Sequence, residues 1–294
     1  MTFTVCIPTC YGGESIIETV RSIRASKNVD NFRVLVVADS IPFPEEVKTK
    51  LKELGVEIFW NDTPGTQMKK NKQMFDMVSS DLVVSTQDDI IFNPDTLNEI
   101  VKALESDPKL TMAGARIFPL PQKTFFESIM ATMLMLAGDV GRRWNNGDNR
   151  LMASGRCLTY RTEHLRKMKI LPGVANSDIY MYLENKRLGG KFASIKDAFV
   201  YIRCPQRLHD QIGPSSRYQY GKTEMVELFG EKVKKEYPIP FGALVGGLVS
   251  QFTSTPIHLA LYCFVFAYLR IFKQARKNAA TAMWKIDAST KNIK

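Results

Sequence analysis

The sequence predicts an α/β fold, with a mostly parallel sheet covered by helices on both faces and an apolar helical segment after it. Three observations support this prediction. Strand and helix patterns alternate through residues 1–116, two strand patterns are apolar throughout, and residues 237–269 contain no Asp, Glu, Lys or Arg. Continuous apolar strands are typical of parallel sheets, whose strands are buried on both faces.

The first half of the chain is predicted to alternate between short strands and amphipathic helices. Continuous apolar or β-branched runs indicate the strands, and apolar side chains spaced three and four residues apart indicate the helices. Strands are predicted at residues 3–7, 33–38, 56–60 and 82–86, and helices around 16–23, at 45–54 and 68–78, and from Pro94.

The pattern changes after Arg116. A Met-rich apolar helix is followed by a polar loop, and Thr162 is placed to cap a helix that follows a further strand. Helices are predicted at residues 125–136 and 178–188, strands at 157–160, 192–195 and 199–202, and the polar loop at 145–149.

Residues 237–269 are long enough in total to cross a bilayer, but Gly246-Gly247 and Pro256 divide them. We therefore expect two interfacial or re-entrant helices rather than one span, with a buried core hairpin as the alternative. Arg270, Lys273, Arg276 and Lys277 follow at once and favour anionic lipid headgroups, so residues 237–277 are predicted to meet a membrane surface. They begin a basic tail that carries much of the surplus positive charge. The basic residues of this tail are Arg270, Lys273, Arg276, Lys277, Lys285, Lys291 and Lys294.

The formal net charge of +10 is compatible with a polyanionic or membrane partner. The chain lacks both the interleaved basic and aromatic residues and the motifs of nucleic-acid modules, so no nucleic-acid partner is expected. Five scattered cysteines without a Cys-x-x-Cys pair indicate a reducing compartment. No signal-peptide pattern precedes the first strand, so we expect the protein at the cytoplasmic face of a membrane, either peripheral or held by one short segment.

Acidic residues follow three of the first four predicted strands. Asp39 follows the second, Asp62 the third and Asp88-Asp89 the fourth. In an open α/β sheet, ligands bind beyond the carboxyl ends of the strands. Adjacent carboxylates repel unless a cation offsets them, and Mg²⁺ and Mn²⁺ prefer oxygen ligands. The doublet therefore predicts a divalent metal site, with a solvated turn or a helix cap as the plainer interpretation.

Short motifs follow one another in a fixed order between residues 4 and 221. They are Val5-Cys6-Ile7-Pro8-Thr9, Val36-Val37-Ala38-Asp39-Ser40, residues 61–71 around Gly65, Thr86-Gln87-Asp88-Asp89-Ile90, Ser154-Gly155-Arg156, Asn176-Ser177-Asp178 and Arg217-Tyr218-Gln219-Tyr220-Gly221. Together they resemble the inverting family 2 glycosyltransferases of the GT-A fold. The resemblance implies a transferase domain at residues 1–236, with a nucleotide-binding half at 1–116 and an acceptor half at 117–236. Residues 237–294 then form the membrane-associating helices and the basic tail.

The resemblance also implies roles for individual residues. Donor contacts are expected from Pro8, Thr9, Asp39, Gly65, Asp88 and Arg217, and a Mg²⁺ or Mn²⁺ site from Asp89 with Asp88 and His209. Asp178 matches the acid proposed as general base. Arg156 is a candidate for the diphosphate, whereas the lysine run Lys69, Lys70 and Lys72 is more typical of a solvated face.

Two departures from the family pattern bear on function. Gln87 stands where many members carry the first Asp of the metal motif, and Tyr218 replaces the Trp of processive synthases. We expect transfer of a single hexosyl group from a nucleoside diphosphate sugar to a saccharide or lipid-linked acceptor. The alternatives are a nucleotidyltransferase of similar fold and a catalytically weak protein that binds nucleotide sugars.

Overall fold

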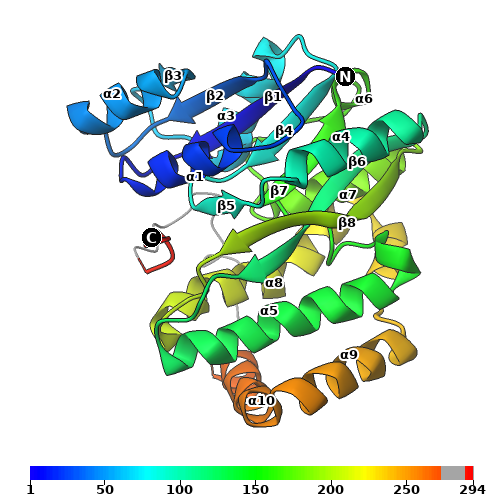
Figure 1. Ribbon diagram of the computed structural model, residues 1–294. Helices are drawn as coiled ribbons and strands as arrows, with labels where there is room; N and C mark the ends of the chain where they lie inside the picture. Colours follow the sequence, from blue (N-terminus) through cyan, green and yellow to red (C-terminus); the bar gives the residue numbers. More distant parts are fainter. Residues whose placement is uncertain (273–288, 294) are drawn as a thin grey trace.

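The computed structural model describes residues 1–272 and 289–293. They form an eight-stranded sheet in the order β3-β2-β1-β4-β7-β6-β8-β5, with helices on both faces (Figure 1). The α/β prediction is confirmed, but the sheet is mixed rather than mostly parallel, because β7 runs antiparallel to both of its neighbours and β5 runs antiparallel to β8.

The first half folds as predicted from its apolar patterns. Its four strands are mutually parallel, and the connecting helices lie on the two faces of the sheet. The elements are β1 (Phe3–Thr9), α1 (Ser15–Arg24), β2 (Arg33–Ala38), α2 (Glu45–Glu53), β3 (Val56–Trp60), α3 (Gln67–Met77) and β4 (Leu82–Thr86).

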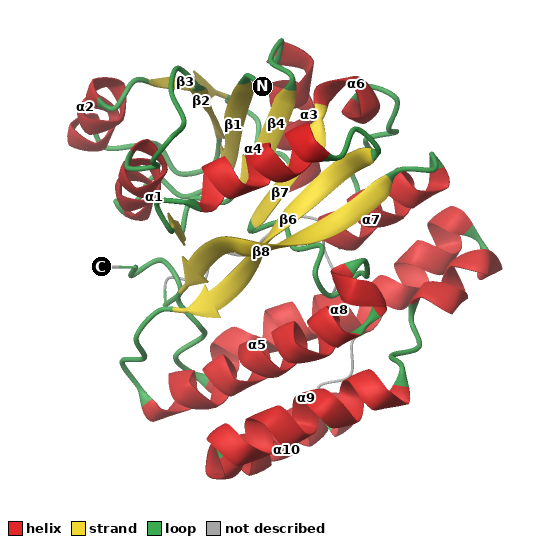
Figure 2. Ribbon diagram, turned by 45° about the vertical axis from the view of Figure 1, so that its right-hand side comes forward, coloured by secondary structure: helices red, strands yellow, loops and turns green. Residues whose placement is uncertain are grey.

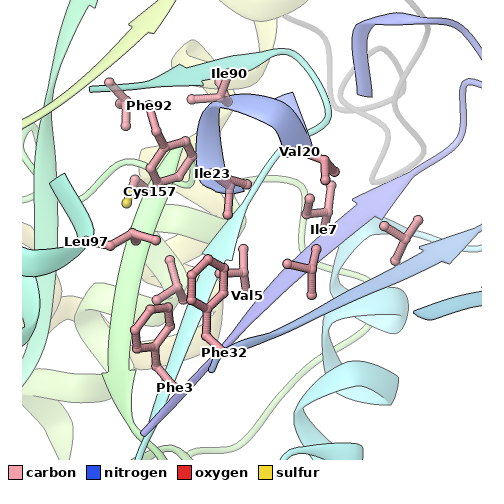
Figure 3. Close-up of a cluster of buried hydrophobic side chains, with 14 of the residues drawn as sticks. Phe3, Val5, Ile7, Val20, Ile23, Phe32, Ile90, Phe92, Leu97 and Cys157 are labelled. Atoms are coloured by element: carbon pink, nitrogen blue, oxygen red, sulfur yellow. The ribbon is translucent and has the colours of Figure 1, made fainter. Parts of the chain in front are cut away.

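Alternate residues of β1 supply two different cores, as a pleated strand requires. Val5 and Ile7 pack with Val20 and Ile23 of α1 on one face of the sheet (Figure 3). Cys6 points to the other face, into the core that includes residues of α3. Packing on both faces holds β1 in place. It therefore also fixes the position of its carboxyl end and of the residues that follow.

The second half adds strands to the other side of β4. Its elements are β5 (Ile90–Phe92), α4 (Thr96–Ser106), β6 (Leu110–Pro119), α5 (Phe125–Arg143), η1 (Asn145–Gly147), β7 (Cys157–Arg161), α6 (Thr162–Leu165), α7 (Ser177–Arg187), β8 (Lys191–Ile202), α8 (Leu208–Phe229) and η2 (Glu231–Glu236).

Several predictions for this half need correction. The two strands expected at 192–195 and 199–202 are one strand, β8, which stays paired with β6 across a register shift at Ala115/Arg116. Thr162 does not cap α6, since Arg161 holds the N-cap position and makes no side-chain cap hydrogen bond. The strand β6 and the long helix α8 were not predicted.

Two apolar helices, α9 (Phe241–Ser254) and α10 (Pro256–Ile271), follow as expected. Pro256 begins α10, but Gly246-Gly247 lies inside α9 and does not divide it. A Cβ at Gly247 would lie 2.6 Å from Val140 Cγ2, so this glycine allows α9 to approach α5 closely. Figure 2 shows α9 and α10 as an outer layer beyond α5, away from the parallel half of the sheet.

Only one side of this outer layer is buried. Residues such as Ala243 and Gln251 are buried, whereas Phe241, Phe252 and Phe264 are exposed. None of the helices in the described part of the chain has the length and hydropathy of a membrane span. Of the predicted basic tail, Lys273, Arg276, Lys277, Lys285 and Lys294 lie outside the described residues.

Candidate functional site

The sheet opens between the carboxyl ends of β1 and β4. Strand β2 pairs with β1 as far as Thr9↔Ala38, whereas β4 pairs with β1 only as far as Cys6↔Ser85. Pro8, which has no N–H to donate, lies in the part of β1 that β4 leaves unpaired. The chain runs outward from β1 to β2 and β3 and then returns to β4 on the other side. This reversal of strand order is where open α/β sheets bind ligands.

A hydrogen bond connects the two strand ends at this opening. The Thr9 hydroxyl donates to Asp88 Oδ2 at 2.5 Å, and Asp88 is buried. Asp89 is the next residue and is partly exposed. Burial raises the pKa of Asp89 and the neighbouring Asp88 acts in the same direction, while Lys291 and Arg156 oppose them. Thr9 therefore holds one carboxylate in place beside a second, at the position predicted from the sequence.

Lys291 reaches these carboxylates from a distant part of the chain. Its Nζ lies 2.5 Å from Asp88 Oδ1 and 3.0 Å from Asp89 Oδ2. Burial disfavours the charge on the Lys291 ammonium, but the two carboxylates outweigh it and raise the pKa of Lys291 above its ordinary value. The sequence analysis placed this lysine in the basic tail and gave it no role of its own, and the structure places it at the strand ends.

Asp39, at the end of β2, organises the loop that precedes α3. The side chain is buried and accepts hydrogen bonds from Gly65 N at 2.8 Å and from Lys70 Nζ at 2.7 Å. Lys70 is itself buried, so the interpretation of this lysine as part of a solvated face is wrong. The contact of Asp39 with a nucleotide stays a prediction, and in this structure its carboxylate fixes the backbone around Gly65.

Asp178 stands at the first turn of α7 with two hydrogen-bond donors. Gly155 N donates to Oδ2 and the Ser177 hydroxyl donates to Oδ1, each at 2.9 Å. The negative charge of Asp178 acts to raise the pKa of both Arg156 and Arg217. Asp89 has the same effect on Arg156. Burial lowers the pKa of Arg217. The structure thus brings the predicted base together with both predicted arginines.

Helix α8 is fixed against the start of α7 by buried polar contacts. Glu224 accepts hydrogen bonds from the backbone N–H groups of Ala175 and Asn176, at 2.7 and 3.0 Å. The Asn176 side chain in turn donates to the Arg217 carbonyl at 2.7 Å. These contacts set the position of Arg217 relative to Asp178, although the two residues lie far apart in the sequence.

His209 is not gathered with the predicted metal ligands. Its side chain is 93% exposed, near Asp210 at the start of α8. Within residues 1–272 and 289–293, no three His, Cys, Asp or Glu side chains are grouped to hold a metal ion. Asp88 and Asp89 nevertheless fit a divalent cation, because a lysine ammonium lies against both of them. Mg²⁺ commonly takes one or two carboxylates and completes its shell with phosphate oxygens and water.

The sequence did not single out two residues that shape this site, Lys291 and Arg203. Lys291 is 203 residues from Asp88, so no local spacing connects them. Arg203 follows β8 directly, and its buried guanidinium pairs with the buried Glu127 at 3.0 Å. The only sequence signal for Arg203 is a charged residue immediately after an apolar strand.

Comparisons with known proteins give a family from the sequence and a fold from the structure. The sequence profile described as Glycosyl transferase family 2 matches residues 4–168. No curated protein sequence matches the chain. Among solved structures, the chain is similar to a mannosyltransferase from Pyrobaculum calidifontis in complex with GDP-Man and Mn²⁺. The TM-score is 0.58 and the identity 14%, with 95% of this chain and 77% of that chain covered.

Two further structures resemble the chain at similar identity. One is glucosyl-3-phosphoglycerate synthase from Mycobacterium tuberculosis with Mn²⁺, UDP and glucosyl-3-phosphoglycerate, at a TM-score of 0.51 and 16% identity, covering 77% of this chain and 79% of that one. The other is TarS 1-349 from S. aureus, at a TM-score of 0.51 and 14% identity, covering 92% and 81%. At such identities these likenesses establish the fold alone.

Proposed function

The chain belongs to glycosyl transferase family 2, and we propose that it transfers one sugar from a nucleoside diphosphate sugar to an acceptor hydroxyl, with inversion. The observation that carries this proposal is the pair Asp88 and Asp89 at the opening between β1 and β4, with Asp88 held by Thr9. Two of the similar structures hold Mn²⁺ together with GDP-Man or UDP. A nucleoside diphosphate with a divalent cation is the ligand that this arrangement of acids fits.

We propose that Asp89 and Asp88 hold Mg²⁺ or Mn²⁺, and that Pro8, Thr9, Asp39 and Gly65 line the nucleotide side of the site. When bound, the cation neutralises negative charge on the diphosphate as the sugar leaves. Asp39 contributes by fixing the loop around Gly65 rather than by presenting a free oxygen, since its carboxylate is buried and already accepts hydrogen bonds.

We propose Asp178 as the general base. Its two donors, Gly155 N–H and the Ser177 hydroxyl, orient the carboxylate, and a carboxylate so placed takes the proton of an attacking hydroxyl. Asp178 and Asp89 both raise the pKa of Arg156, so we place this arginine between the proposed base and the proposed metal ligands. Direct attack of the acceptor hydroxyl on the anomeric carbon is a single displacement, so the proposed transfer proceeds with inversion. Replacement of the synthase Trp by Tyr218 favours single transfer over processive synthesis.

Calorimetric binding tests the donor site directly. We would titrate UDP-, GDP- and dTDP-sugars into the purified chain, with and without Mn²⁺. Metal-dependent binding of one nucleotide class supports the proposal and identifies the donor base. If a folded chain binds none of them, the proposed donor site is wrong.

We further propose that α9 and α10 rest on the cytoplasmic face of a membrane, without crossing it. Phe241, Phe252, Ile257 and Phe264 all expose more than six-tenths of their surface, on helices that carry no acidic residue. Large apolar side chains gathered on one outer layer mark an interaction surface, and Arg270 at the end of α10 suits anionic headgroups. The odd number and scattered positions of the cysteines favour a reducing compartment. An enzyme held there reaches saccharide acceptors carried on lipids.

Vesicle flotation tests this surface. We expect the chain to float with vesicles that contain anionic lipid, and the double variant Phe252→Asp/Phe264→Asp to remain in the soluble fraction. Trp60→Asp replaces an exposed aromatic residue on β3, in the other half of the molecule, and should float like the parent. Equal flotation of the two variants, or self-association of the parent without vesicles, would contradict a membrane as the occupant.

A further inference from the structure

Residues 289–293, the docked segment, return to the donor site after α10. Arg203 Nε donates to the Asn292 carbonyl at 2.9 Å, and Lys123 Nζ lies 3.3 Å from Asn292 Oδ1. Arg203 is buried and pairs with buried Glu127, and Ile293 is also buried. The segment is therefore anchored through Asn292 and Ile293, by contacts that do not involve the acidic pair after β4.

Lys291 extends from this anchor toward Asp88 and Asp89. An open cavity of about 260 Å³ lies beside it, lined by the loop after β1, the start of α1 and the segment itself. The docked segment thus forms one wall of an open space and does not fill the space. The lining residues are Tyr11, Glu14, Ser15, Glu18, Lys291, Asn292 and Ile293.

A divalent cation at Asp88 and Asp89 would repel the Lys291 ammonium from its present position at 2.5 and 3.0 Å. Lysine carries its charge on a flexible four-carbon stem, so the ammonium can be redirected while the backbone stays anchored. The oxygens of the incoming diphosphate are the negative charges nearest to the metal. They also gain charge as the sugar leaves, and a cation already in place stabilises that change without reorganisation.

We propose that Lys291, carried by the docked segment, binds the diphosphate of the donor beside the metal, an inference that rests on the proposed transferase function. In the free protein the same ammonium neutralises the acidic pair. The segment is then a structural part of the donor site, supplied from far along the chain, and its anchor at Asn292 and Ile293 sets the reach of the lysine.

The test measures binding of UDP and GDP with Mn²⁺ to the full chain by calorimetry, so that activity is not needed. Lys291→Met keeps the length of the side chain and removes its charge. It should weaken nucleoside diphosphate binding about tenfold, the effect of losing one charge-assisted hydrogen bond. Lys291→Arg should remain within about threefold of the parent, because the charge is kept.

Two further variants separate placement from charge. Ile293→Asn keeps the lysine and the net charge but disrupts the anchor, and it should weaken diphosphate binding to a similar extent while the melting temperature shows that the fold persists. Lys232→Met removes one charge from an exposed lysine on η2 and should leave binding unchanged. Uridine or guanosine, which lack the diphosphate, should bind the parent and Lys291→Met equally.

Equal or tighter nucleoside diphosphate binding by Lys291→Met would overturn the inference, and tighter binding would identify the segment as a plug that competes with the metal. Failure of the parent itself to bind any nucleoside diphosphate would instead count against the proposed function. The two failures are distinguishable, because lack of binding by the parent is detected before any variant is compared.

Discussion

Gly155 offers a direct way to displace the proposed base without touching it. The Gly155 N–H donates to Asp178 Oδ2 at 2.9 Å, and a Cβ built on Gly155 would lie 2.9 Å from Oδ1 of the same carboxylate. Real Cβ contacts are essentially never shorter than 3.0 Å and most exceed 3.4 Å, so an ordinary contact in Gly155→Ala requires the carboxylate to move by about half an ångström. The backbone at Gly155 has no positive φ, so alanine fits the chain there without strain of its own.

The magnitude follows from that displacement. Misplacement of a reacting group by about 1 Å costs roughly a hundredfold in rate, so half of that displacement should lower kcat about tenfold. Crowding costs about 1 kcal/mol, which the lower chain entropy of alanine in the unfolded state largely offsets. We therefore expect a melting temperature close to that of the parent and a dissociation constant for the donor within about twofold.

The assay follows release of nucleoside diphosphate from the donor identified by calorimetry, with donor affinity measured separately on the same protein. Gly213→Ala serves as the matched control, because a Cβ at Gly213 in α8 would meet nothing within 4 Å. A kcat equal to that of the parent in Gly155→Ala would refute the placement of Asp178 at the reacting hydroxyl. Weaker donor binding with unchanged kcat would move Asp178 to the donor side of the site.

Three further predictions concern the acidic residues. Asp89→Ala should abolish turnover and metal-dependent nucleotide binding with the fold intact, and retained metal-dependent binding in calorimetry would remove Asp89 as a ligand. Asp178→Asn should reduce kcat at least a hundredfold with donor binding nearly unchanged, since the base acts on the acceptor, and parental rates would exclude it as the base. Lys70→Met should lower the free energy of unfolding in urea by about 3 kcal/mol, because it leaves the buried Asp39 without its cation. Asp39→Asn/Lys70→Met should recover part of that loss, and a Lys70→Met effect under about 0.5 kcal/mol would mean that the pair does not stabilise the fold.

The parallel half of the fold was predictable because its elements are specified locally. Each strand from β1 to β4 is a short segment rich in apolar or β-branched residues, and each helix between them carries apolar side chains at helical spacing. The acidic ends of β2 and β4 follow from the same reasoning, since parallel strands place their carboxyl ends at one edge. The positions of Asp39, Asp88 and Asp89 were therefore accessible from the sequence alone.

The unpredicted elements depend on distant partners. Strand β6 has the sequence Leu-Thr-Met-Ala-Gly-Ala-Arg-Ile-Phe-Pro, whose central residues are small rather than β-branched, and it becomes a strand by pairing between β7 and β8. Helix α8 contains Pro214 and two glycines, which oppose helix formation, and it is held by contacts such as Glu224 with the start of α7. Local propensity was overridden by tertiary contacts in both cases.

The burial of Lys70 could have been predicted from the sequence. It precedes the buried Met74 by four residues, so helical spacing places both on the inward face of α3. Lys69 and Lys72 lie on other faces of α3 and are exposed. Their positions in the helical repeat are what distinguish them from Lys70. A buried lysine on such a face needs an anionic partner, and Asp39 at the end of the adjacent strand was the available one.

The charge balance of the site is the property hardest to predict from the sequence, because each acidic side chain lies near a basic side chain from a different part of the chain. Asp39 pairs with Lys70 of α3, Asp88 and Asp89 with Lys291, and Asp178 lies near Arg156 and Arg217. The carboxylates mark the strand ends locally, whereas their partners arrive only through tertiary structure. Because each carboxylate has a cation nearby, repulsion among the carboxylates costs the folded state little free energy. In the proposed donor complex a metal and a diphosphate would bring opposite charges, so Lys291 and Arg156 could exchange a carboxylate for a phosphate without leaving any charge unpaired.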